Sequence, residues 1–185
     1  REKKSIIFSL LNYEFLKRWE GERLEAYRDI GGVWTIGVGH TKNVKPGQTI
    51  TSEESKEFLD QDIKWAVDTV NNSVKVLLNQ NQFNALVSLC FNIGPTAFTG
   101  STCLRRLNNN DYPGAAEALT WWNKDRINGK LVVVPGLVNR RNAEKTLFNA
   151  PTLYTNWDDE EVEKLTREFV LNLNKIWNKG LINGK

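Results

Sequence analysis

The stretch WEGERLEAYRDIGGVWTIGVGH, residues 19–40, marks the point where the hydrophobic pattern of the chain changes. Before it, over residues 5–20, apolar residues recur every three or four positions, which is the spacing of an amphipathic helix. Gly21 is typical of a helix end. Between residues 24 and 48, short β-prone pieces alternate with glycines and other turn residues. The pattern therefore predicts a helix followed by a small antiparallel sheet.

Helical spacing resumes after the predicted sheet. The sequence TSEE at residues 51–54 has the form of a capping box, and the apolar residues after it predict one long helix that ends near Asn71 or Asn72. Asn128-Gly129 indicates a short hairpin. Further helices are expected over residues 80–92, 100–107, 112–122 and 136–148, and a last helix from Asp158.

The expected fold class is α+β, with a small antiparallel β lobe joined by a long helix to a mainly helical lobe. The β lobe is expected over about residues 22–50, within a domain that spans residues 1–150. Residues 151–185 are expected to form a helical extension packed on the same domain, although a separate binding segment is an alternative.

The composition limits the class of protein. The chain has 185 residues, of which 40% are hydrophobic, and this is enough for one domain with its own core. Its net charge of +3 is compatible with an anionic polymer as partner, but it is also common among soluble proteins. The longest early apolar run, residues 6–11, is too short to span a bilayer, so we expect no membrane insertion.

Cys90 and Cys103 are the two cysteines of the chain, which excludes a disulfide-rich scaffold. Two buried free thiols are favoured over a single disulfide bridge. One histidine and two separated thiols do not supply a zinc ligand set, so we expect no catalytic metal and no other cofactor. The tryptophans invite a sugar-stacking interpretation, but four fall in helical patterns and are assigned mainly to core packing: Trp65, Trp121, Trp122 and Trp177.

Three polar residues of the opening stretch are candidates for catalysis. Glu20 lies in the last turn of the first predicted helix, where the negative end of the helix dipole favours a protonated carboxyl, the form that a general acid needs. Asp29 is either a turn residue that caps its own backbone or a second carboxylate that activates water. Thr35 is either an ordinary strand residue or a hydroxyl that holds this water. For Glu20, the alternative is an exposed surface side chain.

His40 is more often a hydrogen-bonded structural residue than a catalyst. A carboxylate from the long predicted helix, such as Asp62, is expected to pair with it and to tie the β lobe to the helical body.

Taken together, these residues resemble the phage-type lysozymes, the endolysin family of T-even and lambdoid bacteriophages (glycoside hydrolase family 24). The signature of that family is a Glu, an Asp nine residues later and a Thr six beyond it, and Glu20, Asp29 and Thr35 keep both intervals. The similarity covers roughly residues 5–150. It extends through EG at 20–21, TIGVGH at 35–40, QD at 61–62, FNIG at 91–94 and GLVNRR at 136–141.

The resemblance implies a lysozyme-like fold and a muramidase that hydrolyses the bond between N-acetylmuramic acid and N-acetylglucosamine in peptidoglycan. It implies that Glu20 is the general acid, that Asp29 acts on the opposite face of the sugar, and that Thr35 positions water. The family is generally inverting, which requires carboxylates about 6.5–9.5 Å apart.

The resemblance also implies roles for residues around the catalytic group. Thr41, Phe91 and Ser101 match positions that line the saccharide cleft, although Thr41 and Ala118 differ from the residues of the T-even branch. Arg140 matches an arginine that faces the catalytic Glu, and His40 with Asp62 matches a structural ion pair.

Two other functions remain open at this point. A lytic transglycosylase would cleave the same bond without water, but Asp29 and Thr35 favour the activation of water. A non-catalytic glycan-binding protein on the same scaffold is the other alternative. The expected partner is peptidoglycan and not nucleic acid, and the protein is expected to act as a monomer. It would be made in the host cytoplasm and act on the wall after release, by an export route that the sequence does not identify.

Overall fold

The computed structural model describes residues 12–29 and 31–151 of the chain. It divides into two compact units, one of Arg1–Lys64 with Thr155–Lys185 and the other of Trp65–Tyr154. The last helix expected from Asp158, and with it nearly all of the 151–185 extension, lies outside the described residues.

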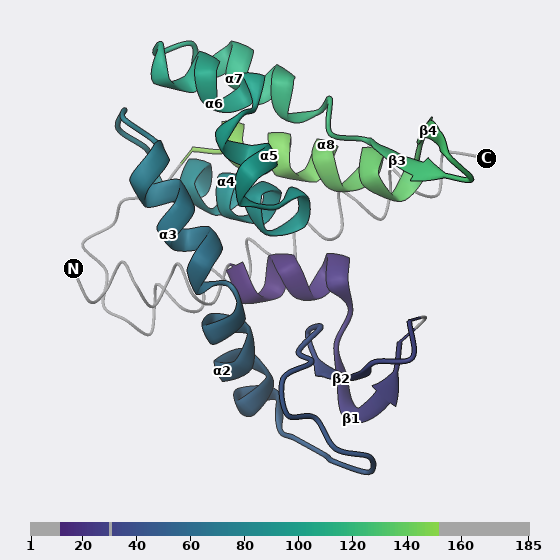
Figure 1. Cartoon of the computed structure of the whole chain (residues 1–185). Coiled ribbons are helices and arrows are strands. Elements are labelled where there is room, and N and C mark those ends of the chain that lie inside the picture. The colour runs from purple at the N-terminus through teal and green to yellow at the C-terminus, as the bar shows by residue number, and fades with distance from the viewer. Residues whose placement is uncertain (1–11, 30, 152–185) are drawn as a thin grey trace, which may run out of the picture. The chain divides into compact units, whose positions relative to one another are not determined.

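The first unit begins its described part with helical residues 12–20, shown in purple in Figure 1. Tyr13, Phe15 and Leu16 are buried on one face of this helix, as the apolar spacing predicts. The helix leads directly into β1 (Arg23–Arg28), which pairs with β2 (Trp34–Gly37) in an antiparallel two-stranded sheet.

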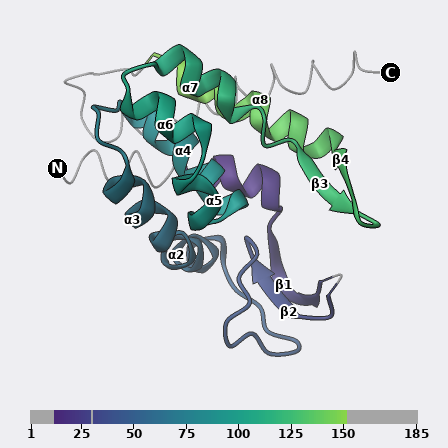
Figure 2. The same cartoon turned by 45° about the horizontal axis from the view of Figure 1, so that its top comes forward.

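Two isolated bridges extend the small sheet, one between Glu25 and Thr49 and the other between Ile36 and His40. Figure 2 shows β1 and β2 side by side, with the long connection that follows β2. The antiparallel sheet predicted over residues 24–48 is therefore present, with two regular strands.

Helix α2 (Ser52–Asp62) starts as its sequence predicts. The side chain of Thr51 accepts a hydrogen bond from the N–H of Glu54, and the Glu54 side chain accepts one from the N–H of Thr51, which completes a capping box.

The single long helix expected up to Asn71 or Asn72 is wrong in one respect, because α2 is followed by a separate helix, α3 (Lys64–Ser73). Ile63 lies between them, keeps right-handed helical dihedral angles, and donates its N–H to the carbonyl of Leu59 at 2.9 Å. The apolar period continues through this residue, so periodicity alone does not reveal a one-residue interruption.

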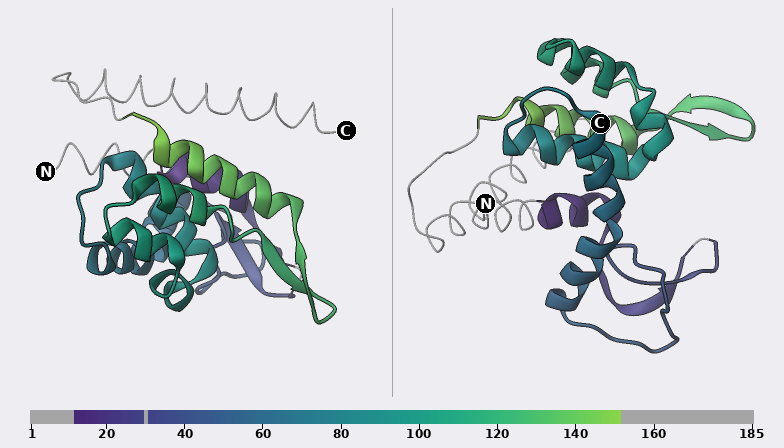
Figure 3. Two further views of the ribbon diagram at one scale, coloured as in Figure 1. Left: turned by 90° about the horizontal axis from the view of Figure 1, so that it is seen from above. Right: turned by 60° about the vertical axis from the view of Figure 1, so that its left-hand side comes forward.

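The second unit is mainly helical. After α3 it contains α4 (Gln80–Ile93), α5 (Pro95–Thr99), α6 (Thr102–Asn108), α7 (Tyr112–Leu119) and α8 (Pro135–Asn149). Helix α4 packs against α8, and α6 packs against α7; Figure 3 shows α4 beside α8. Residues 84–90 of α4 are all buried, so α4 is the central helix of this unit. The core is completed by side chains from the surrounding helices, including Phe98, Leu107, Leu119, Leu147 and Phe148.

Strands β3 (Lys124–Ile127) and β4 (Lys130–Val133) form the hairpin expected at Asn128-Gly129, and both turn residues have positive φ. Figure 3 shows this hairpin projecting from the helices of its unit. Helix α5 is an addition to the expected elements. Pro95 directly follows Gly94, which ends α4, and occupies the first turn of this short helix, where its missing N–H has no cost.

The assignment of tryptophans to core packing is wrong for Trp65 and Trp121, whose side chains are 39% and 52% exposed. Trp65 lies beside the buried stripe of α3, which is formed by Ala66 and Val70, and Trp121 follows the end of α7. The exposure of each tryptophan depends on whether it falls inside the buried stripe of its helix. The helical period of the sequence did not show that Trp65 lies one residue outside this stripe.

Cys90 and Cys103 are both buried free thiols, in agreement with the favoured interpretation of the sequence. Burial raises the pKa of Cys90 to about 11 and that of Cys103 to about 12.

Within residues 12–29 and 31–151, no helix is both long enough and apolar enough to cross a membrane.

Candidate active site

Glu20 is the last residue of the helical segment 12–20, and its side chain is exposed. The following residue, Gly21, has a φ of 75°, and its N–H donates to the carbonyl of Lys17 at 2.9 Å. This left-handed turn ends the helix and favours glycine, because other residues adopt it at a cost. Since β1 starts at Arg23, Glu20 lies at the junction between the helix and the small sheet.

Asp29 directly follows β1 and closes a tight turn. Its Oδ1 accepts a hydrogen bond from the N–H of Val33 at 2.8 Å, and its own N–H donates to the Val33 carbonyl at 3.0 Å. The carbonyl of Asp29 accepts from the N–H of Gly32, which has a φ of 78°. The carboxyl group is thus held in orientation by the turn while its side chain stays exposed.

Arg28 supports the same turn from outside. Its Nη1 donates to the carbonyl of Gly32 at 2.8 Å, and its guanidinium lies 4.8 Å from the centroid of the Trp34 ring. Arg28 and Trp34 are also cross-strand partners in the sheet. This cation–π contact and the hydrogen bond connect the two ends of the turn.

Thr35 lies on β2 opposite Tyr27, and it is only 4% exposed. Its Oγ1 donates to the carbonyl of Val33 at 3.1 Å. Because this bond uses the hydroxyl proton, the lone pairs of Oγ1 are left to accept a hydrogen bond from another group. Asp29 and Thr35 therefore both bond to the backbone of one residue, Val33, which fixes the two side chains in a common frame.

His40 forms the pair with Asp62 that the sequence predicts. Its Nδ1 lies 2.8 Å from Oδ2 of Asp62, and its Nε2 lies 2.9 Å from the carbonyl of Lys42. The ring stacks on Phe58 of α2, with centroids 4.3 Å apart. These contacts tie the segment after β2 to α2, which is a structural role. Thr41, the next residue, is exposed.

The remaining predicted site residues belong to the second unit. Phe91 near the end of α4 is half-buried and stacks on Trp65, with centroids 5.9 Å apart. Ser101 is 4% exposed and caps α6, because its Oγ accepts from the N–H of Leu104 at 3.1 Å. Its hydroxyl thus has a helix-capping role. Ala118, one of the two departures from the T-even branch, is buried in α7.

Arg140 is 4% exposed and lies in a buried polar cluster of α4 and α8. Its Nε donates to Oε1 of Glu144 at 3.2 Å. The same carboxylate oxygen accepts from the hydroxyl of Ser88 at 2.7 Å and from Arg141 at 3.0 Å. Glu144 therefore holds the guanidinium of Arg140 in place within its unit.

Comparison with known proteins identifies the family. The model of the Phage lysozyme family matches residues 17–144. The endolysin of Salmonella phage P22 is 50% identical over 138 residues, covering 72% of this chain and 91% of that protein. The endolysin of Acyrthosiphon pisum secondary endosymbiont phage 1 is 49% identical over 135 residues, covering 73% and 92%. The chain belongs to the phage lysozyme family.

A solved structure supports the same conclusion. The endolysin from Escherichia coli O157:H7 phage FAHEc1 superposes with a TM-score of 0.72 at 40% identity, covering 78% of this chain and 94% of that chain. The expected lysozyme-like α+β fold is thereby confirmed. As a phage lysozyme, the protein is an enzyme, a peptidoglycan-degrading muramidase.

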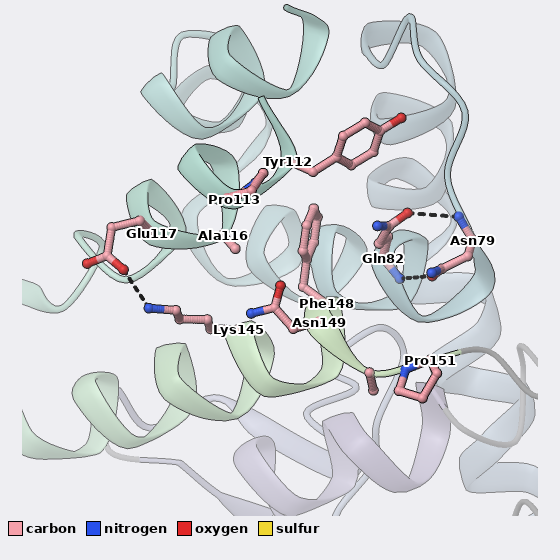
Figure 4. Close-up of a pocket in the computed structure, with 11 residues that line it drawn as sticks. Asn79, Gln82, Tyr112, Pro113, Ala116, Glu117, Lys145, Phe148, Asn149 and Pro151 are labelled. Carbon is pink, nitrogen blue, oxygen red and sulfur yellow. Dashed lines mark hydrogen bonds and ion pairs between the residues drawn. The ribbon is translucent and has the colours of Figure 1, made fainter. Parts of the chain in front are cut away.

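The second unit of this phage lysozyme has a pocket of about 530 Å³, and the residues that line it include none of the predicted site residues. Figure 4 shows Tyr112, Phe148 and the ion pair of Glu117 with Lys145 among the groups that line it. In the described part of the chain, no cluster of three or more His, Cys, Asp or Glu residues is arranged to hold a metal ion.

Glu22 is a residue beside the candidate acid that the sequence analysis missed. Its carboxylate accepts a hydrogen bond from the hydroxyl of Tyr13 and pairs with Nζ of Lys17 at 2.8 Å. Burial alone would raise the pKa of Glu22, but the hydrogen bonds from Lys17 and Tyr13 outweigh it and lower this pKa. Burial, together with the carboxylate of Glu22, raises the pKa of Tyr13.

The signal for this cluster was present in the sequence. Tyr13 and Lys17 are four residues apart and lie on one face of the helix, so an acid just past the helix end reaches both. Glu22 thus braces the turn that follows Glu20.

Proposed function

We propose that Glu20, Asp29 and Thr35 perform the muramidase reaction of this enzyme on peptidoglycan. The observation that supports the proposal best is the shared anchoring of Asp29 and Thr35 to the backbone of Val33. The carboxylate that acts as base and the hydroxyl that binds the water must keep a fixed orientation relative to each other. The hydrogen bonds of Asp29 and Thr35 to Val33 provide this orientation.

In this mechanism, the carboxyl of Glu20 donates its proton to the glycosidic oxygen as the bond between that oxygen and the anomeric carbon breaks. A water molecule donates one hydrogen bond to the carboxylate of Asp29 and the other to Oγ1 of Thr35. Both hydrogens of the water are then engaged, and its lone pair is directed away from them, toward the anomeric carbon. Asp29 takes one proton of the water as the new carbon–oxygen bond forms.

Residues outside this group are proposed to bind or support the site. Thr41, Phe91 and Ser101 are proposed to contact the saccharide, and Ser101 also caps the start of α6. The ion pair of His40 and Asp62 keeps the segment after β2 on α2. Arg140, held by Glu144, is proposed to face Glu20 in the assembled site. The enzyme is further proposed to act as a monomer on the cell wall after release from the cytoplasm.

The test is product analysis on purified peptidoglycan with matched variants. Glu20→Gln is expected to fold as the parent and to release about 10²–10⁴-fold fewer reducing ends, because general acid catalysis contributes a factor of that size. Glu25→Gln serves as the control, because Glu25 is also exposed and lies on the neighbouring strand. A fully active Glu20→Gln enzyme would refute the assignment.

The role of water is tested by the product itself. Hydrolysis of the β-linked bond with inversion produces the α anomer of the new reducing end before mutarotation, and NMR can detect it. Asp29→Asn and Thr35→Ala are expected to impair this reaction strongly. An anhydro sugar in place of the reducing end would instead support a lytic transglycosylase. Binding of peptidoglycan with no release of soluble fragments would support a non-catalytic protein.

A further inference from the structure

Trp65 presents an aromatic surface to solvent at the start of α3. Its side chain is 39% exposed, although its neighbour Ala66 is fully buried. The indole stacks on the ring of Phe91, with an interplanar angle of 28° and centroids 5.9 Å apart. Both residues lie in the second unit, so two consecutive helices, α3 and α4, meet in one aromatic pair.

The buried face of α3, formed by Ala66 and Val70, does not include Trp65. A large indole left partly in water keeps apolar area exposed that a ligand can cover. Stacking on Phe91 restricts the rotation of the Trp65 ring, so binding of a ligand there would cost little side-chain conformational entropy.

Trp121 is a contrasting case in the same unit. It is more exposed than Trp65, at 52%, but the guanidinium of Arg106 lies 5.1 Å from the centroid of its ring. Its aromatic contact is therefore with a cation of the protein itself, whereas that of Trp65 is with a second aromatic ring. The ring of Trp65 is thus held by a second apolar ring and not by a charged group.

We propose that Trp65 and Phe91 form an aromatic platform that binds one pyranose ring of the peptidoglycan glycan strand through its C–H face. A β-linked pyranose has axial hydrogens on its faces and hydroxyl or acetamido groups at its edge, so a face stacks on an aromatic surface while the edge stays in water. The inference rests on the proposed function for its substrate, and it adds Trp65, a residue to which sequence analysis gave a packing role.

The test compares Trp65→Ala and Trp65→Phe with Trp121→Ala, using solubilised, uncross-linked glycan strands. Because the platform touches a sugar but not the reacting atoms, Trp65→Ala is expected to raise KM about 3- to 10-fold with kcat nearly unchanged. Trp65→Phe is expected to show a smaller rise, and Trp121→Ala none. An unchanged KM for Trp65→Ala would overturn the inference.

A second measurement does not depend on turnover. Glycan strands added to Glu20→Gln protein are expected to change its tryptophan emission, and Trp65→Phe in that background should remove most of this change while Trp121→Phe leaves it. Equal responses of the two double variants would contradict the platform. Reducing-end release by the parent enzyme tests the proposed function separately, so either idea can fail while the other stands.

Discussion

Replacement of Glu144 by glutamine tests the energetics of the buried polar cluster of α4 and α8. Glu144 is fully buried, and its Oε1 accepts hydrogen bonds from Ser88, Arg140 and Arg141. Its Oε2 lies 2.9 Å from Nε of Arg141. Glutamine keeps the shape of this side chain, but it removes the negative charge from between two buried guanidinium groups and brings an amide N–H₂ against at least one donor.

The expected cost follows from the burial of these charges. Removal of one partner from a buried ion pair destabilises a protein by about 3–5 kcal/mol, because the remaining charge stays desolvated. For a chain of this size, about 2–4 °C of Tm correspond to each kcal/mol, so Tm is expected to fall by about 6–20 °C. Thermal unfolding followed by circular dichroism and by calorimetry at pH 7 measures the change.

Glu117→Gln is the matched control, because Glu117 also pairs with a residue of α8, Lys145, at 2.5 Å. That pair is at the surface, with Glu117 57% exposed, and such pairs contribute about 0–1 kcal/mol. The two variants make the same chemical change in the same unit. If Glu144→Gln unfolds within 2 °C of Glu117→Gln, the reasoning from burial is wrong.

Two further predictions concern titrating groups. Since the folded-state pKa of Glu22 lies below its ordinary value of 4.5, its ionised form stabilises the fold above that value, and this stabilisation is lost as the pH falls through the lowered pKa. The Tm difference between the parent and Glu22→Gln is therefore expected to shrink as the pH falls from 7 to 3; a constant difference would count against the cluster. Because burial raises the pKa of Cys90 and Cys103 to about 11 and 12, neither is expected to react with a disulfide reagent at pH 8 until denaturant is added, when two thiols should appear. Rapid reaction of one thiol in the native protein would refute this.

The elements that the sequence predicts well are those determined by neighbouring residues. The capping box at Thr51, the helix end at Gly21 and the hairpin at Asn128-Gly129 each depend on hydrogen bonds within a few positions, and all three form. The interruption at Ile63 was not predictable from the pattern, because it changes neither the period nor the composition of the helix.

Site features that depend on tertiary packing could not be read from spacing. Periodicity predicts that Trp65 lies on a helix, but it does not predict that the ring is partly exposed or that it stacks on Phe91 of α4. The same holds for Ser88, which has no visible motif and yet hydrogen-bonds to Glu144 across 56 positions of sequence.

In the turn at Asp29, the two roles that the sequence presented as alternatives are compatible. Capping its own backbone and serving as a base were alternatives there, yet the hydrogen bond from Val33 engages Oδ1 of a group with two oxygens and about four lone-pair sites. A base has to be oriented before it can take a proton along one line. The turn supplies that orientation through Val33, which also receives the hydroxyl of Thr35, so the structural role of Asp29 is a condition of its proposed chemistry.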